Sequence, residues 1–276
     1  MTILGRKYGT HDPSEWLEEG AGLLASARAI RAQWWILRRK FSRKSDQGQV
    51  LFSPRPSEMT RLVGLPRASM LLLGYSAEMY LKSGLIRIYT GCDEAVINSE
   101  VKKFGHNFVG IAKEISYPTS QKIKDRLIML QRCVQSDARY PIEISQVSKE
   151  KIDVEYANRV NCRTRIMWDS TEFSALCDLV KSIRAHVQRI DGDCENPTSF
   201  RRLDLSHGGY LVLRDGGNLQ SRITYRPEDG KKEMRTVSEI QQLLIDAEWI
   251  EAKHYWNRFV VMEITKKNHL VNMQLQ

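Results

Sequence analysis

The histidine best placed to do chemistry is His106, which stands beside Gly105 and follows the basic pair Lys102 and Lys103. An imidazole titrates near neutral pH and can accept or donate a proton, whereas a lysine ammonium attracts a phosphate as a point charge. Such residue types are compatible with acid–base chemistry beside a phosphate. The structural alternative is that the ring caps or packs against the helix expected after it.

The basic residues of the chain are candidates for contact with nucleic acid. A formal net charge of +9 and a pI near 9.3 favour polyanionic partners, RNA or DNA. The densest run ends the first expected helix, where cations also stabilise the helix dipole without binding anything, so both interpretations stay open. The nucleic-acid-binding candidates are Arg38, Arg39, Lys40, Arg43, Lys44, Lys102 and Lys103.

Other catalytic and metal-binding patterns do not occur in the sequence. It has no Gly-x-x-x-x-Gly-Lys phosphate loop and no Gly-x-Ser-x-Gly nucleophile turn. The five cysteines are scattered, with no Cys-x-x-Cys pair and no His-x-x-x-His pattern. We therefore expect no metal, no cofactor and no disulfide framework, and reduced, mostly buried thiols.

The elements that must position these residues are amphipathic helices. A first helix is expected after Asp12, with Asp12 as its cap and Pro13 at its first position. Gly20 and Gly22 would let another helix approach it closely. Apolar residues at spacings of three, four and seven predict further helices. These are expected over 66–89, after His106, over 119–136 and from the capping motif at 169 to about 190, with a loop over 41–56.

A composition change at residues 191–206 predicts a linker to a small C-terminal module. Two alternating segments, 210–214 and 220–225, are joined by Asp-Gly-Gly-Asn and predict a β-hairpin. A capping box from Thr236 to Glu239 predicts a short helix, and residues 258–264 a final strand. Basic residues near the hairpin either contact a phosphate backbone or are simply solvated; they are Arg222, Arg226, Lys231, Lys232 and Arg235, with Tyr225 among them.

The fold class expected from these elements is mainly α. A helical bundle over residues 1–190 is followed by the linker and by a small α+β module over residues 207–276. No apolar run is long enough to span a bilayer, and the N-terminus lacks the apolar core of a signal peptide. We expect a cytoplasmic protein with no membrane contact.

The helical part resembles the HEPN superfamily, the helical bundles of prokaryotic toxins, defence systems and nucleotidyltransferase partners. Four segments carry the resemblance over about residues 12–190. They are, in order, Ser14-Glu15-Trp16-Leu17; Leu72-Leu73-Gly74-Tyr75-Ser76-Ala77-Glu78 with Leu81-Lys82; Gly105-His106-Asn107-Phe108; and Ala138-Arg139-Tyr140-Pro141. The last resembles the Gly-Arg-Tyr-Pro found after the fourth helix in one branch.

The resemblance implies a possible chemistry, because many HEPN proteins are metal-independent endoribonucleases. Their signature is an arginine, four to six residues and then a histidine; the histidine transfers the proton and the arginine holds the phosphate. His106 has no arginine at this spacing, so a degenerate site would need Arg139 or a lysine. The literal spacing occurs at Arg6–His11 and before His207, both outside the expected bundle helices.

Three functions follow from the resemblance. The first is a HEPN-like protein of a prokaryotic defence or toxin-type system, without an intact nuclease motif, that binds nucleic acid or a partner protein. The second is a metal-independent endoribonuclease with a degenerate site at His106 and Arg139. The third is a structural partner of a nucleotidyltransferase. The expected partners are a second copy of the chain, RNA more than DNA, and the product of a neighbouring gene.

Overall fold

A computed structural model describes residues 11–46, 55–137, 169–229 and 235–273. Its helical part contains the elements α1 (Pro13–Asp46), α2 (Pro56–Ile88), α3 (Glu94–Phe104), α4 (Phe108–Glu114), α5 (Gln121–Arg132), the π-helical turn η2 (Cys133–Asp137) and α7 (Ser170–Gln188). The C-terminal part contains β1 (Ser199–Asp204), η3 (Ser206–Gly208), β2 (Tyr210–Asp215), β3 (Arg222–Arg226), α8 (Val237–Asp246), α9 (Ile250–His254), η4 (Trp256–Arg258), β4 (Val260–Ile264) and β5 (Leu270–Asn272). The mainly α class is confirmed, with a small sheet at the C-terminal end.

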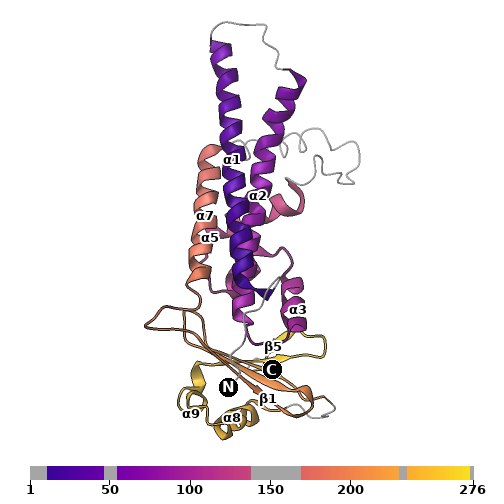
Figure 1. Cartoon of the computed structure of the whole chain (residues 1–276), viewed down its shortest axis with the longest axis vertical. Helices are drawn as coiled ribbons and strands as arrows, with labels where there is room; N and C mark the ends of the chain where they lie inside the picture. The colour runs from indigo at the N-terminus through magenta and orange to yellow at the C-terminus, as the bar shows by residue number, and fades with distance from the viewer. Residues whose placement is uncertain (1–10, 47–54, 138–168, 230–234, 274–276) are drawn as a thin grey trace.

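Helices α1 and α2 form a long antiparallel pair whose outer ends extend past the end of α7 (Figure 1). The loop expected over residues 41–56 begins too early, because α1 continues to Asp46, and the helix expected from residue 66 begins at Pro56. Pro56 occupies the first turn of α2, where its missing N–H costs nothing. We call the part of this pair from about Arg31 to Arg67 the projecting hairpin.

Pro66 lies inside α2, although the sequence analysis placed it at the start of that helix. A proline has no N–H, so it leaves the carbonyl four residues before it, that of Leu62, without its helical donor. The indole Nε1 of Trp34 in α1 donates to that carbonyl at 3.1 Å. The neighbouring helix thus supplies the hydrogen bond that the proline removes, and α2 continues through it.

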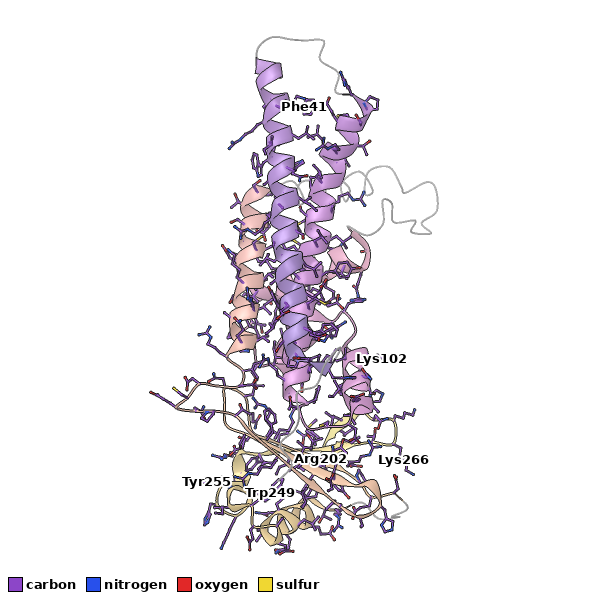
Figure 2. All side chains as sticks on the ribbon, in the orientation of Figure 1. Phe41, Lys102, Arg202, Trp249, Tyr255 and Lys266 are labelled. Atoms are coloured by element: carbon purple, nitrogen blue, oxygen red, sulfur yellow. The ribbon has the colours of Figure 1, made fainter. Side chains whose placement is uncertain are left out.

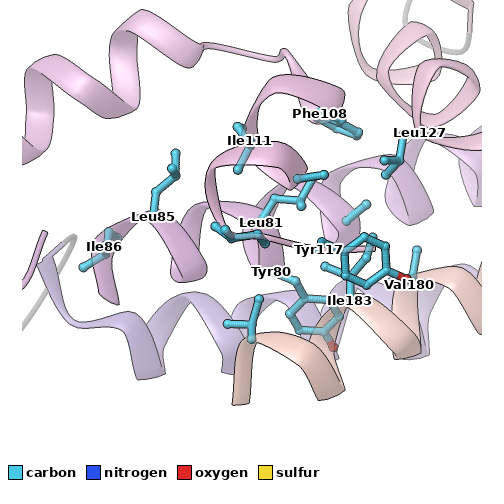
Figure 3. Packing of buried hydrophobic residues seen from close by; sticks show 14 of the residues in the cluster. Tyr80, Leu81, Leu85, Ile86, Phe108, Ile111, Tyr117, Leu127, Val180 and Ile183 are labelled. Atoms are coloured by element: carbon cyan, nitrogen blue, oxygen red, sulfur yellow. The ribbon is translucent and has the colours of Figure 1, made fainter. Parts of the chain in front are cut away.

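Helix α2 is the centre of the bundle, and it contacts α1, α7, α4 and α5 (Figure 3). Its fully buried members include Leu73, Tyr80, Leu81 and Leu85. The expected close approach of α1 occurs at Gly20, where an added Cβ would lie 2.6 Å from the Tyr80 ring, but not at Gly22, which has open space around it.

The five strands form one sheet in the order β1-β2-β3-β4-β5. The expected hairpin is confirmed as the antiparallel pair β2–β3, and β4 returns parallel to β3 after α8 and α9. Alternate strand residues face opposite layers. Tyr210 and Val212 share the core of the bundle, whereas Leu211, Leu213 and Ile223 pack in the core beneath α8 and α9.

Several elements differ from the expectation. The strand expected over residues 258–264 is not the final one, because β5 follows β4 and pairs with it. Strand β1 lies within the residues assigned to the linker, and it pairs antiparallel with β2. Helix α3 was not predicted, although Asp93 and Glu94 open it and Lys102 and Lys103 close it in agreement with the helix dipole. None of the helices in the described ranges is long and apolar enough to cross a membrane.

Candidate functional site

The projecting hairpin concentrates the positive charge of the chain. Between Arg31 and Arg67 the sequence holds nine lysines and arginines but only two acids, Asp46 and Glu58. This excess of seven is most of the net charge of +9. The outer part of the hairpin extends beyond the end of α7 (Figure 1), and its residues Arg38, Arg39 and Lys40 are exposed to a polyanion.

The first three basic candidates, Arg38, Arg39 and Lys40, are exposed on α1. The Arg38 guanidinium lies 5.1 Å from the Trp34 ring and 5.4 Å from the Trp35 ring, a cation–π geometry. Lys40 forms an exposed ion pair with Glu58 at 3.1 Å. The side chains of the other two candidates on this helix, Arg43 and Lys44, lie outside the described residues.

Arg31 anchors the base of this basic surface. It is 3% exposed, lies between the rings of Trp34 (4.4 Å) and Phe173 (4.7 Å), and donates to the Asp169 carbonyl at 2.9 Å. Burial, together with the nearby Arg38 charge, lowers the pKa of Arg31 to about 10. A guanidinium in this position ties α1 to α7 and is a structural cation, unlike the exposed arginines farther along the helix.

His106 lies in the turn between α3 and α4, beside the buried carboxylate of Glu78 in α2. Its Nδ1 is 3.1 Å from Glu78 Oε1, within ion-pair distance but not aligned for a hydrogen bond. Lys82, one turn along α2, contacts the same oxygen at 2.5 Å. Glu78 itself is only 2% exposed, a burial that helical spacing alone did not indicate.

This arrangement places an imidazole beside a buried carboxylate. Glu78 lies on the Nδ1 side of the ring, and an imidazole can accept or donate a proton. The His106 side chain is 40% exposed, so a ligand can reach the ring. The cap of α4 is Asn107, whose Oδ1 accepts from the Gly110 N–H at 2.9 Å. His106 therefore does not serve as that cap.

The remaining basic candidates, Lys102 and Lys103, do not lie together with those of the projecting hairpin. Lys102 and Lys103 are exposed at the end of α3, and Lys103 contacts the buried Glu100 carboxylate at 3.1 Å. They lie toward the sheet, far from Phe41 on the projecting hairpin (Figure 2). Arg139 lies outside the described residues, so its distance from His106 stays open.

The arginines near the C-terminal hairpin face inward. Arg222 donates to Glu114 at 2.8 Å, Arg226 to Asp93 at 3.1 Å, and Arg235 to the buried Glu228 at 2.6 Å. Carboxylates of the protein itself bind these three residues, so simple solvation does not describe them. Lys231 and Lys232 lie outside the described residues.

The histidines with the literal nuclease spacing have other surroundings. Arg202 pairs with Asp93 and Asp204 and stacks on the Tyr210 ring at 3.9 Å, while His207 lies in the tight turn η3. Arg6 lies outside the described residues. His186 lies 2.8 Å from the Ile115 carbonyl, a packed histidine as expected.

Three of the described thiols, Cys92, Cys133 and Cys177, are buried, and Cys194 is exposed. Burial raises the pKa of Cys92 to about 12 and that of Cys177 to about 11, so neither carries a thiolate near neutral pH. In the part of the chain that the structure describes, no three His, Cys, Asp or Glu side chains are grouped so that they could hold a metal ion.

Comparison with protein-family models, with curated proteins and with solved structures gave no significant match.

Proposed function

We propose that this protein is a HEPN-like component of a prokaryotic defence or toxin-type system and that it binds RNA through the projecting hairpin. The observation that carries the proposal is the concentration of positive charge on α1 and α2 beyond the end of α7. Exposed arginines beside tryptophan rings can contact the phosphate backbone and stack against bases.

The test removes the charges of Arg38, Arg39 and Lys40 by substitution with glutamine. Each phosphate contact to a single strand contributes about 0.7 to the slope of log K against log salt, so three lost contacts should lower that slope by about 2. We expect Kd for a single-stranded RNA to rise at least about tenfold at moderate salt. Fluorescence anisotropy with a labelled RNA measures both quantities.

A matched control variant replaces three exposed cations outside the hairpin, Lys113, Lys122 and Arg189, with glutamine. It makes the same change in net charge and should leave the salt slope near that of the wild type. Equal weakening by both variants would show that RNA responds only to overall charge. If the wild type shows no salt-dependent RNA binding, the RNA-binding proposal is wrong and a structural role, such as that of a nucleotidyltransferase partner, is left.

A second candidate function is metal-independent RNA cleavage at His106. The observation that favours it is the position of the His106 ring against the buried Glu78 carboxylate. Cleavage of RNA in EDTA, abolished by His106→Ala with an unchanged melting temperature, would support it. The variant Glu78→Gln should then reduce the rate by impairing ring orientation. An absence of cleavage at high protein concentration would reject it.

We also propose that the chain forms a homodimer. Three of its exposed large apolar side chains lie on the projecting hairpin: Ile36 (71% exposed), Met59 (44%) and Val63 (44%). Apolar surface of this kind favours association with a second copy or with the product of a neighbouring gene. Light scattering at high micromolar concentration should give the mass of a dimer, and a monomer at that concentration would contradict the proposal.

A further inference from the structure

A second group of arginines lies where the bundle meets the sheet. Arg214 of β2 and Arg222 of β3 are direct partners in the antiparallel register. Both point to the bundle, where Arg222 reaches Glu114 and Arg214 reaches the Ile190 carbonyl. Like charges directly opposite each other on neighbouring strands repel, so this pair needs negative charge nearby.

The protein supplies less negative charge than the group requires. Arg87 of α2 forms a short ion pair with Asp191, and Arg222 pairs with Glu114 at 2.8 Å. Arg214 approaches the second Asp191 oxygen only to 3.9 Å. Three guanidinium groups therefore share two carboxylates, which leaves one positive charge in excess at a largely buried position.

Several donors of this group are buried without an acceptor. The Arg214 side chain is 3% exposed, and its Nη2 donates to the Ile190 carbonyl and the Thr198 hydroxyl. Among the described residues, its Nε and Nη1 have no hydrogen-bond partner, nor do Arg222 Nη1 and Arg87 Nε. The buried acceptor without a partner in this group is Asp191 Oδ1, so the donor atoms outnumber it four to one.

The segment after α7 folds over Arg214. Thr198 N–H donates to the Asp191 carbonyl at 2.9 Å, and Asn218 N–H donates to the Ile190 carbonyl at 3.0 Å. Gly217 has a φ of +67°, and a Cβ there would lie 2.1 Å from Thr198 Oγ1, so only glycine permits this contact. On the outer side of the group, Asp191 is 35%, Arg87 18% and Arg222 16% exposed, which leaves a route from solvent.

We propose that the arginines 87, 214 and 222 bind a phosphate that keeps one proton. Guanidinium groups hold tetrahedral oxyanions through paired N–H donors, and the two negative charges of a phosphate with one proton would more than offset the one excess positive charge. The remaining P–OH group donates to Asp191 Oδ1, which would repel a fully ionised oxyanion. Sulfate has no such proton near neutral pH, so the site selects phosphate over sulfate. Binding would fasten the sheet to the bundle.

The test is thermal unfolding of the full chain in sodium phosphate or sodium sulfate, with the ionic strength held constant by sodium chloride. At about ten times its Kd, phosphate should raise the Tm by about 3 °C, and sulfate should raise it less. Arg214→Met should abolish the phosphate-dependent shift. Arg61→Met, which removes an exposed charge from the projecting hairpin, should retain it.

A shift that persists in Arg214→Met, an equal shift with sulfate, or no shift in the wild type would overturn the proposal. Hydrogen exchange of the wild type decides the question if Arg214→Met does not fold. Phosphate should then slow exchange over residues 190–198 and 214–222; protection confined to residues 31–67 would place the anion on the hairpin and overturn the assignment. Failure of RNA binding leaves this outcome unaffected, because the RNA-binding variant changes none of these residues.

Discussion

The projecting hairpin and the junction between bundle and sheet are both rich in arginine, but the arginines of the two regions differ in burial and in carboxylate partners. On the hairpin, Arg38 and Arg39 are exposed, beside tryptophan rings and with few acids nearby. At the junction, Arg222 and Arg226 are held by Glu114 and Asp93. Burial and carboxylate partners, more than residue type, thus separate an arginine that is exposed to a large ligand such as RNA from one that also holds the fold together.

The largest expected effect is a loss of folding stability at Glu114, an acid of the junction, which is compared below with an acid of the hairpin. Glu114 accepts from Arg222 at 2.8 Å and from the Tyr89 hydroxyl at 3.2 Å, both largely buried. Glu114→Ala leaves these donors without an acceptor and should lower the free energy of unfolding by about 2–3 kcal/mol. This loss of unfolding free energy is measured by denaturant titration, with unfolding monitored by circular dichroism.

The matched hairpin variant is Glu58→Ala, which removes the partner of the exposed Lys40. Exposed ion pairs contribute little, so the loss should stay within about 1 kcal/mol. If Glu58→Ala destabilised the protein as much as Glu114→Ala, the contrast between the two regions would not hold.

Variants in the turn between α3 and α4 are expected to have an effect of intermediate size on stability. Asn107 caps α4, and Asn107→Ala should cost about 1 kcal/mol of stability, the usual cost of a lost cap. His106→Ala should cost no more than this, because Lys82 continues to contact Glu78. Thermal unfolding of the two variants side by side measures the difference, and a larger loss for His106→Ala would make that ring a structural residue.

The smallest expected effect concerns Glu263, a buried acid of β4. Burial raises its pKa above the ordinary value of 4.5, so the folded state binds the proton more tightly than the unfolded state. The stability contribution of this group is then greatest at low pH and falls as the pH rises from 4.5 through the raised pKa.

Glu263→Gln removes that titration. The variant should gain stability relative to the wild type as the pH rises from 4 to 8, and Tm measured across this interval tests it. A constant difference between the two proteins over the interval would mean that this carboxyl group titrates alike in the folded and unfolded states.

The sequence by itself predicted the elements whose signals are local. The N-cap at Asp12, the hairpin of β2 and β3 and the capping box at Thr236 are set by neighbouring residue types and by apolar periodicity. Local sequence likewise indicated His106 as the histidine best placed to do chemistry. Its HEPN-like role stays a proposal.

Only the tertiary structure decided the features that depend on contacts between distant segments. Helix α2 continues through Pro66 because Trp34 donates to the carbonyl that the proline leaves free. Glu78 lies buried beside His106, and Arg222 faces Glu114, 108 positions away along the chain. Residue spacing encodes neither contact, because burial and charge pairing are set by which surfaces meet when the bundle packs against the sheet.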